Sequence, residues 1–229
     1  LWLTGWYPSS THPDAGNFIV RHANAFVQSQ VNREQSLGLV VAHFPVYSFW
    51  RMLKYGKALV KPKPEAHLMS GAELLWSPVP QFGGGLLGRW VSYQYYKWRV
   101  GRVLRQWVAD NGLPLGVHVH AADKVMRVVP GFLDYCLATF GKRLPLWYTE
   151  HWAIFNEVVF DGFGKRNAVF KGDMIKLWGR VDVAAPVSLH SHAQMQRYLG
   201  GAKPFVLFPN VVDTGVFRKI SGLEGTNGN

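Results

Sequence analysis

A strand, a helix and a second strand are predicted over residues 115–149, LGVHVHAADKVMRVVPGFLDYCLATFGKRLPLWYT. Residues 115–121 and 145–149 are short runs of aliphatic and aromatic residues, which are typical of buried strands. Between them, Pro130 suits the first turn of a helix and Gly141 suits the position just past its end. Strands that alternate with helices in this way indicate a parallel sheet.

The same alternation continues on both sides of this unit. Further strands are predicted over residues 1–6, 37–44, 66–76, 181–187 and 205–208. Helices are predicted from Asn17 onward, over residues 90–109 and 166–179, and from the cap residue Ser188 to Gly200. The predicted fold class is α/β: a Rossmann-like, doubly wound, mostly parallel sheet with helices on both faces. This domain is expected to span residues 1–210, and residues 211–229 to form an interdomain linker or poorly ordered tail.

Composition narrows the classes of partner. Of the 229 residues, 48% are apolar, which is ample for a packed core, yet no apolar run reaches the length of a membrane-spanning helix. The net charge of +11 predicts attraction to polyanions, either nucleic acid, an anionic bilayer or phosphorylated substrates. Zinc-finger spacing and RNP-like motifs are absent from the sequence and the basic residues are dispersed, so a nucleic-acid partner is not predicted.

The start of the chain and its single cysteine bear on location. The chain opens on Leu1 without a basic leader region, so we expect it to begin inside its first strand rather than with a signal peptide. Cys136 lies in a helix-like apolar run and is expected to be an inert, packed thiol in a reducing compartment. The prediction is a cytoplasmic protein.

Polar residues follow three of the predicted strands, where ligands bind in open α/β sheets. In the first loop, Gly16 and Asn17 precede a helix, whose N-terminal N–H groups favour a phosphate or carboxylate. An ordinary turn with a helix cap explains the same residues equally well. Glu150 and His151 follow another strand, and because neighbouring residues there point in different directions, they are not expected to form an acid/base pair.

His118 and His120 share one side of a predicted strand. Two imidazoles at this spacing raise the question of a metal site, but the sequence suggests no third ligand at a fixed spacing, so no metal is predicted. A polar strand end and a substrate contact by His120 both stay open on the residues alone.

Six short segments occur in one order along the chain: Trp6-Tyr7-Pro8, Gly16-Asn17-Phe18-Ile19 with His22-Ala23, His118-Val119-His120, Tyr148-Thr149-Glu150-His151-Trp152, Ala185-Pro186-Val187-Ser188 and Phe208-Pro209-Asn210-Val211-Val212-Asp213. Together and in this order they resemble family 4 glycosyltransferases of the GT-B fold, over nearly the whole chain. The last segment is the most specific of the six. It departs from the family in having Val211 where Gly is common.

The resemblance implies an N-terminal, acceptor-side domain of a retaining glycosyltransferase that works without a metal or other cofactor. Its co-substrate would be a nucleotide-sugar and its acceptor a glycan or lipid-linked molecule, as in cell-envelope polysaccharide biosynthesis. Gly16 and Asn17 would lie near the donor phosphates, His120 beside the transferred sugar as the catalytic residue, and Glu150 and His151 on the acceptor side. The family's donor-binding domain would lie beyond residue 229, so residues 1–229 alone are expected to be inactive.

Two other classes of function remain open, a non-catalytic Rossmann-like binding module and a peripheral membrane-binding domain. Residues 46–63 mix aromatic and basic side chains without an acidic residue. This pattern suits an anionic membrane surface, here the inner face of the plasma membrane. A solvated basic loop with its aromatic residues packed inward would have the same composition.

Overall fold

A six-stranded parallel sheet forms the centre of the computed structural model, which describes residues 1–8, 16–33, 37–55, 68–121, 124–151 and 168–210. Its strands lie in the order β4 (Ala72–Trp76), β2 (Leu39–His43), β1 (Trp2–Thr4), β6 (Val117–His120), β7 (Leu146–Thr149) and β8 (Val183–Ala184). Counted within this sheet alone, the order is 3-2-1-4-5-6, the doubly wound arrangement of Rossmann-like folds. The predicted fold class is confirmed.

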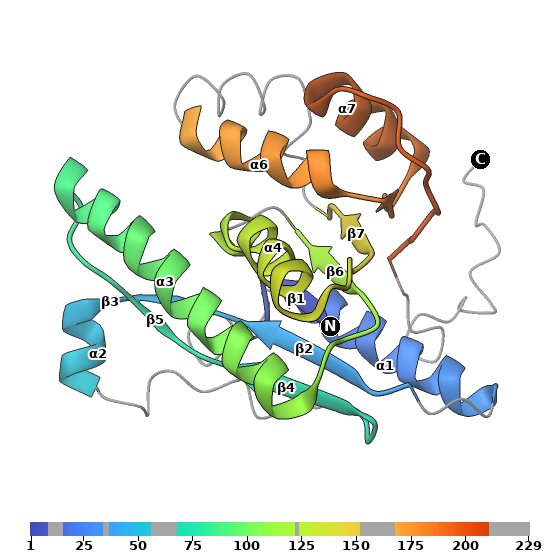
Figure 1. Ribbon diagram of the computed structural model, residues 1–229, viewed down its shortest axis with the longest axis horizontal. Helices are drawn as coiled ribbons and strands as arrows, with labels where there is room; N and C mark the ends of the chain where they lie inside the picture. Colours follow the sequence, from blue (N-terminus) through green and yellow to red (C-terminus); the bar gives the residue numbers. More distant parts are fainter. Residues whose placement is uncertain (9–15, 34–36, 56–67, 122–123, 152–167, 211–229) are drawn as a thin grey trace, which may run out of the picture.

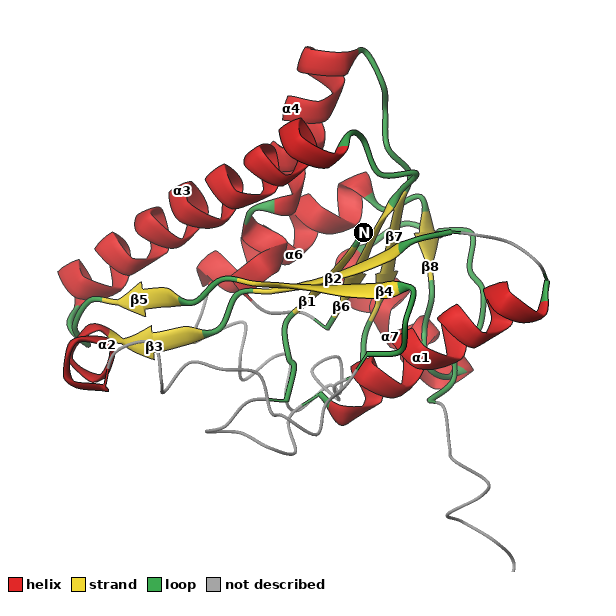
Figure 2. Ribbon diagram, turned by 90° about the horizontal axis from the view of Figure 1, so that it is seen from below, coloured by secondary structure: helices red, strands yellow, loops and turns green. Residues whose placement is uncertain are grey.

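Helices cover both faces of the sheet (Figures 1 and 2). One face packs against α3 (Leu86–Asn111), α4 (Val129–Phe140) and α6 (Ala168–Arg180), and the other packs against α1 (Asn17–Asn32). Trp178 Nε1 in α6 donates to Gly200 O at 2.6 Å, which ties α6 to the end of α7 (Leu189–Leu199). The short 3-10 helix η2 (Lys124–Arg127) precedes α4.

Strand register decides which side chains face which helices. Trp2 pairs with His118 and Thr4 with His120, so side chains in these positions point to the same side of the sheet. Trp2 and Val41 lie in the core beneath α1, whereas Leu3 and Val119 lie in the larger core beneath α3, α4 and α6. The two histidines of β6 therefore face α1.

Several predicted helix ends are confirmed. Pro130 lies in the first turn of α4, and Gly141 ends this helix in a left-handed conformation with φ of 66°. The hydroxyl of Ser188 accepts a hydrogen bond from Ser191 N at 3.1 Å, which caps α7. Cys136 is buried in the large core, and burial raises the pKa of its thiol, in keeping with an inert packing role.

Other expectations were wrong in extent. Residues 205–208 lie along β8 but form a single parallel bridge, Phe205 with Ala184, rather than a full strand; Val206 N and Phe208 N donate to Ala184 O and Pro186 O at 3.0 and 2.9 Å. The sequence also missed a second, two-stranded sheet of β3 (Val46–Ser48) and β5 (Val79–Gln81), together with α2 (Phe49–Tyr55). Helix α3 begins at Leu86, four residues earlier than expected. The predicted tail, residues 211–229, lies outside the described residues.

Candidate functional site

The order of the strands reverses between β1 and β6, and ligands in doubly wound sheets bind beyond the carboxyl ends of the strands at this point. Backbone pairing holds the two strand ends side by side, since Gly5 N donates to His120 O at 3.0 Å. Ala121, directly after β6, has a positive φ of 64°, which is uncommon for a residue with a side chain. The chain thus turns sharply at the switch point.

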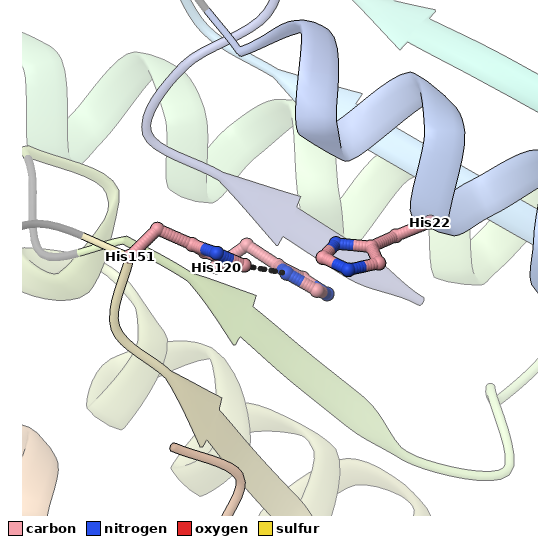
Figure 3. Close-up of side chains that lie close together, drawn as sticks. All are labelled: His22, His120 and His151. Carbon is pink, nitrogen blue, oxygen red and sulfur yellow. Dashed lines mark hydrogen bonds between the residues drawn. The ribbon is translucent and has the colours of Figure 1, made fainter. Parts of the chain in front are cut away.

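Three histidines from separate elements meet there (Figure 3). His120 ends β6, His151 follows β7, and His22 lies on the buried face of α1. His120 Nδ1 and His151 Nε2 are 3.4 Å apart with the rings nearly parallel, and the His22 and His151 ring centroids are 5.3 Å apart. One ring nitrogen from each residue lies within 4.8 Å of the other two. We call this group the histidine cluster.

Aromatic side chains enclose the histidine cluster. The rings of Trp2 and His120 have centroids 4.4 Å apart, those of Phe18 and His151 4.2 Å, and those of Phe208 and His22 4.7 Å. His120 is 0% exposed, so it is a packed residue in this domain. Its contact with a substrate stays a prediction.

The last described segment of the chain fixes the tautomers of two of these histidines. His22 Nε2 lies 3.0 Å from Pro209 O, and since a carbonyl only accepts, this nitrogen carries the proton. His151 Nδ1 lies 3.0 Å from Asn210 Oδ1 and donates to it in the same way. His151 Nε2 is then the acceptor of the hydrogen bond from His120 Nδ1, 3.4 Å away.

Burial keeps these histidines neutral. It lowers the pKa of His151 to about 4, with the Asn210 hydrogen bond opposing it, and lowers the pKa of His22 despite the bond to Pro209. Burial also lowers the pKa of His120 well below 6.5, and the neighbouring histidines add to this effect. At neutral pH the histidine cluster is uncharged.

Gly16 and Asn17 lie at the start of α1, as predicted. Gly16 is buried in a left-handed conformation with φ of 74°, and a Cβ built there would lie 2.7 Å from Trp6 C. Asn17 is exposed at the first position of the helix. Because Phe18 contacts His151, the N-terminus of α1 borders the histidine cluster. The rest of this predicted loop, residues 9–15, lies outside the described residues.

Glu150 points away from the histidine cluster. It is buried and accepts a hydrogen bond of 2.5 Å from the hydroxyl of Tyr148, whose ring lies in the large core. Burial raises the pKa of Tyr148 well above 10, and the nearby Glu150 raises it further. His151 contacts α1 on the other side, so the two neighbours do point apart. The proposed acceptor contact of Glu150 is untested, and Trp152 lies outside the described residues.

His118 and His120 do share one face of β6, with ring centroids 3.9 Å apart. The two rings have different partners. His118 Nε2 makes a hydrogen bond of 2.7 Å with Thr149 Oγ1, whereas His120 belongs to the histidine cluster with His22 and His151. His22 had no predicted role. The sequence did indicate that His22 is buried, because helical spacing puts it on the apolar face of α1 with Ile19 and Ala23.

A second feature lies between β5 and the first half of α3. A cavity of about 680 Å³ opens there, and its lining includes three basic and three aromatic side chains, Arg89, Lys124, Arg127, Trp90, Tyr93 and Tyr96. We call it the α3 groove. Among these residues, the Arg127 guanidinium lies 3.1 Å from Asp173 and over the ring of Tyr93.

Large apolar side chains are exposed beside the α3 groove. Trp50 and Leu53 on α2 are 73% and 61% exposed, and Leu86, Leu87 and Trp90 on α3 are 88%, 74% and 60% exposed. Helix α2 and the start of α3 lie at one end of the molecule, on either side of the small sheet (Figures 1 and 2). We call these five residues the apolar end. Among the described helices, none combines the length and apolar character needed to cross a bilayer.

No protein-family model and no curated protein matches this sequence. Among solved structures, the chain is similar to Arabidopsis thaliana UGT89C1 in complex with UDP, with a TM-score of 0.46 and 13% sequence identity. The match covers 94% of this chain and 54% of that chain, so this chain spans about half the length of the solved protein. The α/β, Rossmann-like assignment rests on the parallel register and the strand order.

Proposed function

We propose that this chain is the acceptor-side domain of a retaining glycosyltransferase that takes its sugar from a nucleotide-sugar. One observation carries the proposal. Segments far apart in the sequence, which the family resemblance singles out, converge at the switch point of the sheet: the start of α1, His120, His151 and the Pro209-Asn210 pair. A Rossmann-like sheet binds its ligand at this position.

Within this proposal, the N-terminus of α1 lies near the donor phosphates, where free N–H groups and the helix dipole favour negative charge. His120 lies beside the transferred sugar, and His151 borders the acceptor side. Neutral imidazoles donate and accept hydrogen bonds at once, which suits sugar hydroxyls. Catalysis then depends on stabilising the leaving diphosphate, and that step needs the second, donor-binding wall of the cleft.

The α3 groove is the proposed site of the acceptor. Arg89 and Lys124 give it a positive lining, which suits an acceptor that carries phosphate or carboxylate groups, while the charge of Arg127 is paired with Asp173. Trp90, Tyr93 and Tyr96 offer flat apolar surfaces. Because Leu86 and Trp90 belong both to this groove and to the apolar end, a lipid-linked acceptor would reach the groove from a membrane surface.

The proposal predicts that residues 1–229 fold alone but transfer no sugar, whereas a protein that also contains a donor-binding domain transfers it with retention of anomeric configuration. In that longer protein, His120→Asn is expected to lower kcat by about 100-fold, as for loss of one aimed hydrogen-bonding group. Asn is chosen because Ala would leave a cavity at this fully buried position.

Product formation and its anomeric configuration are measured by NMR, with circular dichroism to confirm folding. The control is His190→Asn on the exposed surface of α7. Turnover of a nucleotide-sugar by residues 1–229 alone would overturn the two-domain mechanism. Unchanged kcat in a folded His120→Asn protein would remove the catalytic role of His120.

We further propose that the apolar end docks on an anionic membrane at the inner face of the plasma membrane. Exposed tryptophan and leucine suit the headgroup region, and Arg51 and Lys54 on α2 are exposed beside them. Each basic residue near an anionic surface contributes about 1 kcal/mol, so the double change Arg51→Glu with Lys54→Glu is expected to weaken vesicle binding at least about 30-fold.

Sedimentation with anionic and neutral vesicles at low salt measures this binding. The matched control reverses two exposed charges elsewhere, Lys142→Glu with Lys176→Glu, and should bind nearly as tightly as the unchanged chain. If both double variants lost vesicle binding to the same extent, net charge alone would drive binding, and the proposed docking by the apolar end would be wrong. Binding to neutral vesicles that equals binding to anionic ones would also contradict the proposal.

A further inference from the structure

We propose that a cavity between α3, η2, α4 and α6 binds a phosphate group. The cavity has a volume of about 290 Å³, and its helices lie on the other side of the sheet from α1 and the histidine cluster (Figure 2). Its lining includes four basic side chains and one acidic one, Lys97, Arg105, Arg127, Lys176 and Asp173. We call this cavity the basic pocket.

The acidic residue of the basic pocket is already paired. Asp173 is buried, and its Oδ2 lies 3.1 Å from Arg127 Nε. Its Oδ1 accepts a hydrogen bond of 3.3 Å from the hydroxyl of Tyr93. The Arg127 guanidinium also lies over the ring of Tyr93, 4.8 Å from its centroid. Arg127 and Asp173 therefore neutralise each other, and the net charge of the basic pocket comes from its other three cations.

These three cations, Lys97, Arg105 and Lys176, form no ion pair within the described part of the chain. Like charges that line one cavity repel each other, and the repulsion is stronger where protein replaces water. An anion between them would remove this repulsion and gain three favourable charge interactions. The basic pocket is therefore an incomplete charge arrangement that a bound anion completes.

Helical spacing brings two of the cations to the same wall. Lys97, Gly101 and Arg105 follow one another at intervals of four residues, so they lie along one side of α3. A Cβ on Gly101 would lie 3.2 Å from Arg105 Nη1, so the missing side chain leaves room for the guanidinium. On its other side Arg105 lies over the ring of Tyr135 in α4, 5.7 Å from the centroid. Arg105 is thus held between two helices at the basic pocket.

The start of α4 adds to the preference for an anion. Val128, Pro130 and Gly131 line the basic pocket at this helix start. The start has no side-chain cap and its first turn has no acidic residue. The N–H groups and the dipole at a helix N-terminus favour negative charge, which supports the preference set by the basic side chains.

Phosphate suits the basic pocket better than a carboxylate does. A phosphate monoester has a charge of about −1.5 to −2 and three acceptor oxygens, whereas a carboxylate has one charge and two oxygens. The Arg105 guanidinium can bind two phosphate oxygens at once. Pockets for drug-sized ligands measure about 300–1,000 Å³. A volume of about 290 Å³ therefore suits a small phosphorylated group rather than a whole nucleotide-sugar.

The basic pocket joins the α3 groove, because Tyr93 and Arg127 line both cavities. A molecule whose body lies in the α3 groove can therefore place a phosphate group in the basic pocket. We assign this phosphate to the acceptor. The assignment to the acceptor rests on the proposed function, whereas phosphate binding by the basic pocket does not. A free phosphorylated molecule would occupy the basic pocket alone.

The first experiment titrates the 229-residue chain with inorganic phosphate at low salt, followed by calorimetry and phosphorus NMR. Binding is expected to be saturable and at least about 10-fold tighter than the binding of acetate. Arg105→Gln and Lys97→Gln should each weaken it by about 10-fold or more, the usual effect of losing a hydrogen bond to a charged group. The matched control is Arg102→Gln, an exposed arginine of α3 outside the basic pocket, which should bind as the unchanged chain does.

Circular dichroism establishes that each variant is folded. The proposal is overturned if phosphate binding does not saturate, or if acetate binds as tightly as phosphate. It is also overturned if neither Arg105→Gln nor Lys97→Gln weakens binding, or if Arg102→Gln weakens it as much as they do. None of these results depends on whether sugar is transferred.

The second experiment tests the link to the α3 groove with octyl phosphate, used below the concentration at which it forms micelles. Burial of part of its chain in the groove should make it bind at least about 10-fold more tightly than inorganic phosphate. Trp90→Ala, in the α3 groove, should remove this gain and leave the binding of inorganic phosphate unchanged. The control Trp98→Ala changes another exposed tryptophan of α3 and should keep the gain. Equal binding of the two probes by the unchanged chain would overturn the assignment to the acceptor, since the basic pocket would then take a free phosphate.

Discussion

Acidification from about pH 7.5 to about pH 4.5 is expected to remove most of the stability of this domain. Burial lowers the pKa of His43 to about 4 and that of His118 to about 3, from 6.5 for an exposed imidazole. His120 and His151 are lowered for the same first reason. Each of these rings is neutral in the folded protein, and unfolding exposes it to water.

The direction of this change in stability follows from proton binding. Between pH 6.5 and the lowered pKa of each group, the unfolded chain binds more protons than the folded one, so stability falls as the pH falls. It is fully present above about pH 6.5. One pKa unit corresponds to about 1.4 kcal/mol, so His43 alone accounts for about 3 kcal/mol, against about 5–15 kcal/mol for a typical domain.

Urea unfolding followed by circular dichroism at a series of pH values, with a chelator present, measures this dependence. His43→Asn is the informative variant, because His43 Nδ1 donates to Thr4 O at 3.1 Å and the Asn amide can keep that bond without titrating. His43→Asn should reduce the slope of the free energy of unfolding against pH by the equivalent of up to one bound proton. His190→Asn should leave this slope unchanged. A free energy of unfolding that is constant from pH 7.5 to pH 4.5 would contradict the burial of these rings as neutral groups.

Much of the sheet was predictable because its strands are apolar runs that end in turn residues. Residues 115–121 and 145–149 each contain a strand found in the structure, β6 and β7. The small sheet was not predictable in this way, since β3 and β5 have three residues each and β5 contains Pro80. Their parallel pairing depends on contacts between segments more than 30 residues apart, which local patterns do not encode.

The candidate site was predictable only in part, for a related reason. His120 and His151 follow strands, and the parallel sheet brings strand ends to one edge, so their meeting follows from the fold class. His22 is different. A histidine on the apolar face of a helix has no local signal for binding, and its place in the histidine cluster is visible only once α1 lies over β1 and β6. Strand alternation separated Glu150 from His151 as expected, but it did not reveal that Tyr148 takes Glu150 as a partner.

Gly16→Ala is expected to destabilise the domain by at least about 3 kcal/mol. A residue with a side chain in the left-handed region costs roughly 1–2 kcal/mol, and Gly16 has φ of 74°. The added Cβ would also lie 2.7 Å from Trp6 C and 2.8 Å from both Trp6 O and Tyr7 N. All three are backbone atoms next to β1, so the chain itself must shift.

The matched control is Gly131→Ala in α4, where a Cβ meets nothing within 4 Å and alanine favours the helix by up to about 1 kcal/mol. Thermal and urea unfolding of both variants measure the difference, and a Gly16→Ala protein as stable as the unchanged chain would contradict this account. The result also decides how Gly16 can be tested as a donor-phosphate contact. Position 16 requires glycine for steric reasons, so a loss of donor binding in Gly16→Ala would reflect a displaced backbone. The proposed contact with the donor phosphates must therefore be tested at Asn17, which is exposed at the same helix start.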